Sequence, residues 1–218
     1  MGPKLGQQNW GASQKKITSL EVFLNAAIIN PMYENLVEIK EELRGKVFLF
    51  HTRPGVFSKG AVDQGSRLLI ETMEIKPGDT VLDLGCGYGP IGIVAADLAI
   101  QGKVMLVDAN LRAVRLAEEN IKMNSINNAK ALLSDGLEAV ADQQFTVILS
   151  NPPASSGIEI FEEFCQDSFN CLKPTGKLYF VTQGRLKEAV KRVFQKVFGN
   201  YEIAGRNAKY LVSLAVKK

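Results

Sequence analysis

The segment Asn151-Pro152-Pro153 joins a side-chain amide to two consecutive prolines. It directly follows the apolar, β-branched run FTVIL of residues 145–149, which predicts a buried strand. Proline fixes the backbone and cannot donate to a β-ladder, so the strand is expected to end here with Asn151 on a stiff main chain. Because ligands of open α/β sheets lie outside the carboxyl ends of the strands, the amide is a candidate binding or catalytic group. From these residues alone, a simple strand terminator remains the alternative.

A glycine-rich turn lies in the sequence VLDLGCGYGPIG of residues 81–92, between a predicted strand and a predicted helix. Gly85, Gly87 and Gly89 occupy alternate positions, where small residues let a ligand approach the backbone and helix N-terminal amides favour an anionic group. Cys86 lies among them as a small, apolar residue. Such a turn predicts a nucleotide cofactor, either S-adenosylmethionine (SAM) or a dinucleotide such as NAD.

Polar residues near the strand ends favour SAM over NAD. Pro90 interrupts the spacing of a third dinucleotide-binding glycine, and Asp83 precedes the first glycine, where its carboxylate could reach a ligand ammonium or an adjacent turn amide. Asp108 ends the next strand, where an acid holds ribose hydroxyls in either kind of site. Asp135 ends the following strand and suits an adenine amino group, although it could instead cap a helix. The predicted cofactor-binding residues are Asp83, Gly85, Cys86, Gly87, Gly89, Asp108, Ala109, Asp135, Gly136 and Asn151.

The elements that position these residues alternate regularly from Gly65 onward. Strand-like segments are residues 77–85, 103–109, 129–135, 145–153, 176–183, 200–206 and 210–216. Helix-like segments are residues 66–73, 90–100, 111–125, 136–143, 158–173 and 186–198. This alternation predicts an α/β fold, in which a parallel sheet is covered by helices on both faces.

Residues 1–50 are predicted to form a small N-terminal extension, and residues 51–218 the main domain. The extension is expected to contain a flexible arm, then a short helix of residues 20–30, and then a hairpin that turns at Arg44-Gly45. A helix followed by a strand is the alternative for the hairpin region.

Bulk composition excludes several other classes of protein. A net charge of +3 does not by itself mark a nucleic-acid-binding protein. The three cysteines are too few and too scattered for a disulfide framework or a zinc site, and His51 is the single histidine, so no metal site is expected. No segment has the length and apolarity of a signal core or a membrane span, which predicts a cytoplasmic protein with no membrane partner.

Together these motifs resemble the class I SAM-dependent methyltransferases. Asn-Pro-Pro resembles the motif [D/N/S]-P-P-[Y/F/W] of the amino-methylating branch. The segment RPGVFSKGAVDQGSRLLIETM, residues 53–73, resembles the signature of a small-domain group that includes ribosomal RNA guanine-N2 methyltransferases. The matching residues are Pro54, Gly55, Val56, Phe57, Ser58, Asp63, Gly65, Ser66, Leu68 and Leu69. The resemblance implies a Rossmann-like, seven-stranded sheet that is mostly parallel with an antiparallel last strand, SAM as cofactor, and Phe57 and Ser58 as further cofactor contacts.

The resemblance also implies that Asn151, Pro152 and Pro153 are catalytic. The side-chain carbonyl of Asn151 and the backbone carbonyl of Pro152 would accept the two N–H groups of an amine, which turns the nitrogen lone pair toward the cofactor methyl. Ala154 departs from the motif, because an aromatic residue usually stands there and stacks on the target base. Phe57, Phe161 and Tyr210 are candidates for a replacement ring.

The preferred function is SAM-dependent N-methylation of an exocyclic amine of RNA, specifically guanine N2 of ribosomal RNA. A protein methyltransferase that acts on a glutamine amide is one alternative, and a non-catalytic SAM-binding factor in ribosome assembly is another. A nicotinamide-dependent oxidoreductase is the least favoured. Three properties are left open by the sequence: the oligomeric state, the ribosomal subunit, and which nucleotide of the ribosomal RNA is the target.

Overall fold

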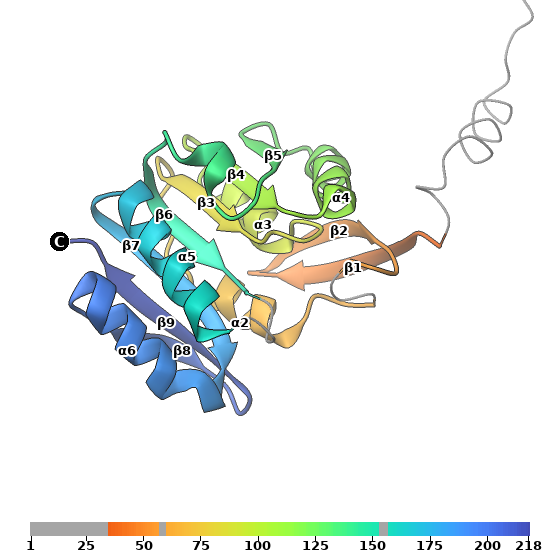
Figure 1. The fold of residues 1–218 in the computed structure, drawn as a ribbon. Coiled ribbons are helices and arrows are strands. Elements are labelled where there is room, and N and C mark those ends of the chain that lie inside the picture. The colour runs from red at the N-terminus through yellow and green to blue at the C-terminus, as the bar shows by residue number, and fades with distance from the viewer. Residues whose placement is uncertain (1–34, 57–59, 153–156) are drawn as a thin grey trace, which may run out of the picture. The chain divides into compact units, whose positions relative to one another are not determined.

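The computed structural model describes residues 35–56, 60–152 and 157–218. The strands of its main sheet are β3 (Thr80–Leu84), β4 (Lys103–Asp108), β5 (Ala129–Leu133), β6 (Phe145–Ser150), β7 (Leu172–Gln183), β8 (Glu202–Arg206) and β9 (Tyr210–Val216). They form a seven-stranded sheet in the order β5-β4-β3-β6-β7-β9-β8 (Figure 1). β9 runs antiparallel to both of its neighbours, whereas the other neighbouring pairs are parallel. The predicted Rossmann-like sheet with an antiparallel last strand is therefore confirmed.

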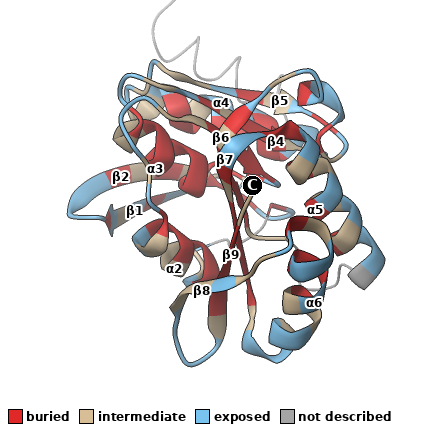
Figure 2. Ribbon diagram, turned by 90° about the vertical axis from the view of Figure 1, so that its left-hand side faces the viewer, coloured by how far each residue is buried: buried red, intermediate tan, exposed pale blue. Residues whose placement is uncertain are grey.

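Helices cover both faces of this sheet. They are α2 (Gln64–Thr72), α3 (Pro90–Leu98), α4 (Leu111–Met123), α5 (Ile158–Cys171) and α6 (Lys187–Phe198). α2, α3 and α4 pack into one core, and α5 and α6 pack into a second. Successive strand residues alternate between the two, since Val81 belongs to the first core and Leu82 to the second. Both faces of the strands are therefore apolar, and exposed residues lie on the outer sides of the helices and on the loops (Figure 2).

The direction in which the chain adds strands reverses between β3 and β6. β4 and β5 extend the sheet on one side of β3, and β6 and β7 extend it on the other. Such a reversal opens a crevice at the carboxyl ends of the two central strands. The glycine turn follows β3 and Asn151 follows β6, so both predicted motifs lie at this crevice.

Two helical predictions differ from the structure. α5 ends at Cys171 and β7 begins at Leu172, although the sequence predicted helix to Lys173 and strand only from Gly176. Pro174 breaks the helical pattern, and Thr175 has a φ of 63°, so β7 is irregular here. The hydrogen bond from Thr175 N to Lys217 O at 2.8 Å still holds this segment at the sheet. The predicted helix of residues 136–143 is reduced to one 3-10 turn, Glu138–Val140.

The predicted hairpin is present as β1 (Val37–Leu43) and β2 (Lys46–Thr52), which pair antiparallel. Arg44 and Gly45 connect them with φ angles of 51° and 77°, as a tight hairpin turn requires. The hairpin belongs to the same compact unit as the sheet, Asn35–Lys218. The arm and the short helix predicted before it lie outside the described residues, and the domain boundary at residue 50 stays a prediction.

Asn120 of α4 and Asn124, which caps the C-terminus of this helix, hold the free edge of β2. Asn120 accepts from His51 N at 2.7 Å and donates to His51 O at 2.9 Å. One helical turn later, Asn124 pairs with the N–H and the carbonyl of Leu49 in the same way. These side chains replace the partner strand that a two-stranded sheet lacks, so the hairpin is joined to α4 by hydrogen bonds as well as by packing. In the described part of the chain, no helix is long and apolar enough to cross a bilayer.

Candidate active site

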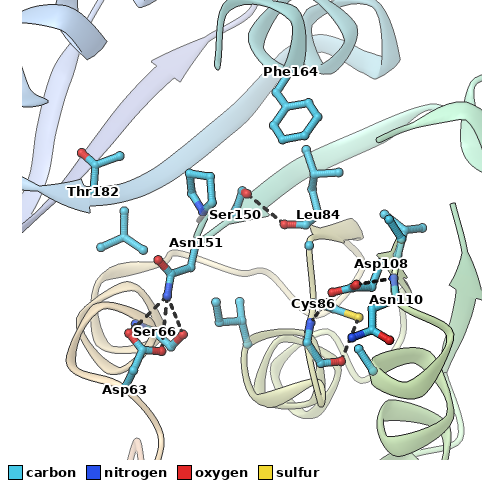
Figure 3. Close-up of a pocket in the computed structure, with 18 of the residues that line it drawn as sticks. Asp63, Ser66, Leu84, Cys86, Asp108, Asn110, Ser150, Asn151, Phe164 and Thr182 are labelled. Carbon is cyan, nitrogen blue, oxygen red and sulfur yellow. Dashed lines mark hydrogen bonds between the residues drawn. The ribbon is translucent and has the colours of Figure 1, made fainter. Parts of the chain in front are cut away.

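A cavity of about 800 Å³ lies at the carboxyl ends of the central strands (Figure 3). The predicted site residues that line it are Gly85, Cys86, Gly87, Asp108, Ala109, Asp135, Gly136, Asn151 and Pro152. Asp83 and Gly89 do not line it. Phe57, Ser58 and Pro153 lie outside the described residues. The cavity thus brings together residues of four strand ends that are far apart in the sequence.

The glycine turn forms one end of the cavity wall. Gly85 and Gly87 have φ angles of 73° and 57°, which side-chain-bearing residues rarely adopt. Nothing lies within 4 Å of the point where a Cβ would stand on either residue. Gly89 differs, because a Cβ there would meet Ile93 and Leu106 at 3.2 Å. The first two glycines therefore leave space beside the cavity, whereas Gly89 allows close packing behind it.

Asp83 lies behind the turn, in the interior. Its side chain is fully buried, and Oδ2 accepts a hydrogen bond from Gly92 N at 2.8 Å. Its other oxygen, Oδ1, has no partner among the described residues. Burial, with a smaller contribution from the charge of Asp108, raises the pKa of Asp83 to about 7. The sequence predicted that Asp83 contacts either a ligand ammonium or an adjacent turn amide. In the structure its carboxylate binds a backbone amide, that of Gly92 in α3.

Asp108 faces the cavity and also orders the loop around it. Its Oδ2 accepts from Gly87 N at 2.9 Å, and its Oδ1 accepts from Asn110 N at 2.8 Å. Each carboxylate oxygen can accept a further hydrogen bond. Asp108 is therefore fixed by the backbone while it retains capacity for ligand hydroxyls.

Asn151 forms the opposite end of the cavity wall. Its Nδ2 donates to both carboxylate oxygens of Asp63, at 3.2 and 3.3 Å, and to Ser66 Oγ at 3.0 Å. Figure 3 shows this cluster across the cavity from Cys86 and Asp108. Ser150, the last residue of β6, donates from Oγ to Leu84 O at 2.8 Å and ties the end of β6 to that of β3. Among the described residues, none donates to the side-chain carbonyl of Asn151.

Sequence reasoning missed several residues of this wall as site residues. Asp63 and Ser66 entered only through the signature, and the contact with Asn151 spans 88 and 85 residues of sequence. Thr182, near the end of β7, lines the cavity, and its Oγ1 is buried with no partner in the described chain. The clue was available, since the sequence VTQ places polar residues at the end of β7 as well. Phe164 lines the cavity beside Gly136, three residues along α5 from Phe161.

The ring that would replace the missing aromatic residue at Ala154 has two described candidates. Phe161 lines the cavity but is only 6% exposed and packs against Phe180 and Phe194. Tyr210 is half-buried and also lines the cavity. Phe57 and Ala154 themselves lie outside the described residues. Tyr210 is therefore the more accessible of the two described rings.

The charges around the cavity discriminate between cofactors. The described residues that line it include the carboxylates Asp63, Asp108 and Asp135, and no lysine, arginine or histidine. Such a wall attracts a cationic ligand and repels a dianionic pyrophosphate. The sulfonium of SAM fits this wall, whereas the pyrophosphate of NAD would meet no cationic side chain among the described lining residues. Burial raises the pKa of the Cys86 thiol, so this cavity residue is a neutral, apolar part of the wall.

Comparisons with known proteins agree with a cavity that binds SAM. A family model described as "Methyltransferase small domain" matches residues 47–213. The uncharacterised protein YbxB of Bacillus subtilis is 36% identical over 181 residues, which are 80% of this chain and 89% of YbxB. The 16S rRNA N2 G1207 methyltransferase RsmC of T. thermophilus, solved with AdoMet and guanosine, is similar with a TM-score of 0.77 and 29% identity over 87% of this chain. The match covers 52% of that enzyme, so the present chain spans about half its length. A methyltransferase from Pyrococcus furiosus shares the fold, with a TM-score of 0.62 and 20% identity over 90% of this chain and 95% of that one.

Proposed function

Because the chain belongs to the methyltransferase small-domain family and is a SAM-dependent methyltransferase, we propose that it methylates an exocyclic amine of RNA, namely guanine N2 of ribosomal RNA. The observation that carries this proposal is the orientation of Asn151. Its amide nitrogen is bound to Asp63 and Ser66, so the carbonyl oxygen is the atom left for a ligand. A free carbonyl at this point can accept an N–H from an amine.

The chemistry needs orientation more than it needs a base. The exocyclic nitrogen of guanine is a weak nucleophile because its lone pair is delocalised into the ring. In the proposed complex, Asn151 Oδ1 and the backbone carbonyl of Pro152 each accept one N–H, which localises the lone pair on the nitrogen and directs it toward the cofactor methyl. Well-oriented reacting groups can contribute on the order of 7–11 kcal/mol to lowering the barrier. The methylated nitrogen is cationic and acidic, so it can release its proton to water after transfer.

The cofactor supplies an electrophilic methyl group on a positively charged sulfur. In this proposal Asp108 binds the ribose hydroxyls, Asp135 binds the adenine amino group, and Gly85 and Gly87 allow close approach to the backbone. Each role uses a residue that lines the cavity. Asn151, Pro152 and Pro153 are proposed as the catalytic segment, and Phe57 and Ser58 as further cofactor contacts.

Guanine as the target is supported by the relative that was solved with guanosine, which shares 29% identity over 87% of this chain. A glutamine side-chain amide also offers an NH₂ group to Asn151, so a protein substrate is the competing outcome. A ribosomal RNA substrate would place the protein in the cytoplasm and in ribosomal RNA processing.

The test is a methyl-transfer survey. The protein is incubated with SAM labelled in the methyl group and either unmodified ribosomal RNA transcribed in vitro or a protein extract. The labelled RNA is then digested to nucleosides and analysed by mass spectrometry. We expect label in N2-methylguanosine. Label confined to protein, or to a nucleoside other than N2-methylguanosine, would contradict the proposal.

A further inference from the structure

The side-chain nitrogen of Asn151 is fully used by the first turn of α2. One acceptor is the carboxylate of Asp63, at 3.2 and 3.3 Å, and the other is Ser66 Oγ at 3.0 Å. A carboxylate accepts hydrogen bonds and cannot donate them, so the group that faces Asp63 must be the NH₂ of the amide. The opposite amide orientation would place the Asn151 carbonyl against a negative charge.

Asp63 is itself held in place by the start of α2. It is the N-cap of this helix, and its Oδ1 accepts from Gly65 N at 2.9 Å and from Ser66 N at 3.1 Å. Gly65 leaves room for this arrangement, because a Cβ there would stand 3.0 Å from Asp63 Oδ1 and 3.3 Å from the ring of Tyr210. These backbone hydrogen bonds fix the Asp63 carboxylate independently of its contact with Asn151.

We propose that Asp63 and Ser66 are positioning residues, which hold the amide of Asn151 in the one orientation that turns its carbonyl oxygen toward the substrate amine. This inference rests on the proposed function, since it assigns a purpose to the free carbonyl. It gives the signature of residues 53–73 a chemical role at the Asn-Pro-Pro segment, because Asp63 and Ser66 belong to that signature.

The same contact explains why residue 151 is asparagine in this chain. The motif [D/N/S]-P-P also admits aspartate. An aspartate at position 151 would face the Asp63 carboxylate across the 3.2 Å that now separates Asn151 Nδ2 from Asp63 Oδ1. Two carboxylates at that distance repel each other unless one is protonated. With Asp63 present, an amide is the side chain that bonds to Asp63 and still offers an acceptor to the cavity.

An exchange of the two side chains tests the proposal. Asp63→Asn keeps the helix cap through Oδ1, since asparagine caps as well as aspartate. It removes the negative charge and replaces Oδ2, which now accepts from Asn151 Nδ2 at 3.3 Å, by an NH₂ group that faces the NH₂ of Asn151. Asn151→Asp places two carboxylates together. We expect each single variant to lower kcat on unmodified ribosomal RNA by about 10–150-fold, the equivalent of one hydrogen bond to a charged group. The double variant restores a donor–acceptor pair with its polarity reversed, and we expect its kcat to exceed that of either single variant.

Ser66→Ala is the matched control for the charge of Asp63. It removes one acceptor from Asn151 Nδ2 while the carboxylate and the helix cap remain, so SAM affinity measured by calorimetry should not change and kcat should fall less than in Asp63→Asn. A readout without cofactor or RNA is the NMR signal of the Asn151 side-chain NH₂ in ¹⁵N-labelled protein. We expect that signal to shift in both Asp63→Asn and Ser66→Ala.

The outcomes separate this inference from the proposed function. If the wild-type protein transfers no methyl group to guanine N2 of ribosomal RNA, the proposed function fails. If it does and Asn151→Ala keeps full kcat, Asn151 is not the amine acceptor and the mechanism that both proposals share fails. If Asn151→Ala is inactive but Asp63→Asn has wild-type kcat, the positioning role is overturned. A double variant with activity no higher than that of the worse single variant would also overturn it, because a positioning pair must show coupling.

Discussion

The two ends of the cavity are built in different ways. At the glycine-turn end, which comprises residues 85–91 and 107–110, the turn is held mainly through main-chain groups. Gly85 N and Cys86 N both donate to Val107 O at 2.9 and 3.0 Å, and the Asp108 carboxylate accepts from two further main-chain amides. At the Asn151 end, which comprises Asp63, Ser66, Asn151 and Thr182, the side chains of Asp63 and Ser66 hold that of Asn151, which comes from a separate segment, and Thr182 lines the same cavity. Single substitutions at the first end should therefore act on stability and cofactor affinity, whereas those at the second should act on the chemistry of the substrate.

The largest expected effect concerns Asp83, the buried acid behind the glycine-turn end. Its pKa is raised to about 7 in the folded state, mainly by burial. The folded protein then binds more protons than the unfolded chain between about pH 4 and pH 7, so stability should fall as the pH rises through this range. Asp83→Asn can still accept from Gly92 N and has no charge to bury.

Thermal or urea unfolding from pH 4 to pH 8 measures this effect. We expect Asp83→Asn to match the wild type near pH 4 and to become more stable than it as the pH rises, by at most about 4 kcal/mol. A parallel pH dependence in both proteins would show that Asp83 is not the group responsible. Loss of SAM binding in a fully folded Asp83→Asn variant would show that Asp83 contributes to cofactor binding and not only to the packing of the interior.

The next largest effect belongs to the other end. Asn151→Ala removes the amide that the proposal places against the target amine, and we expect kcat to fall ~10²–10³-fold, as for other preorganised polar contacts. SAM affinity should stay close to that of the wild type, because the contact is made mainly in the transition state. Steady-state kinetics and calorimetry on the same preparation measure both. A large loss of SAM affinity with unchanged kcat would place Asn151 with the cofactor instead.

Asp108 provides the corresponding test at the glycine-turn end. Asp108→Ala removes a charged acceptor of Gly87 N and, in the proposed complex, of the ribose hydroxyls, so we expect the Kd for SAM to rise about 10–150-fold. Asp108→Asn keeps one acceptor and should lose less. Calorimetry with SAM measures the change, and NAD should show no binding to the wild type. An unchanged Kd in Asp108→Ala would remove this residue from the cofactor site.

The difference between the two ends of the cavity also explains which site residues could be predicted from the sequence. The glycine turn, Asp108 and Asp135 lie near local strand ends, so spacing alone indicated their position at the cavity. Even the burial of Asp83 could have been inferred, since it shares a strand face with Val81, and Val81 packs in the core of α3. The contact of Asp63 with Asn151 could not be inferred from the sequence, because it depends on how α2 packs beside the end of β6. The pairing of Asn120 with His51 was hidden for the same reason, since no local pattern shows that a helix completes a sheet edge.

The smallest expected effect concerns Thr182, and a second threonine makes it measurable. Thr182 and Thr52 both have a buried hydroxyl with no partner among the described residues, but only Thr182 lines the cavity. A buried hydroxyl without a partner destabilises the fold, so Thr52→Val and Thr182→Val should each leave stability unchanged or raise it. If the Thr182 hydroxyl bonds to the substrate base, Thr182→Val alone should raise KM for RNA, by about 2–10-fold for one neutral hydrogen bond. Steady-state kinetics of the two variants on unmodified ribosomal RNA decide the matter. An equal KM in both variants would show that Thr182 does not bind the substrate. Substrate recognition at the Asn151 end would then depend on Asn151 and on the two residues that hold it, Asp63 and Ser66.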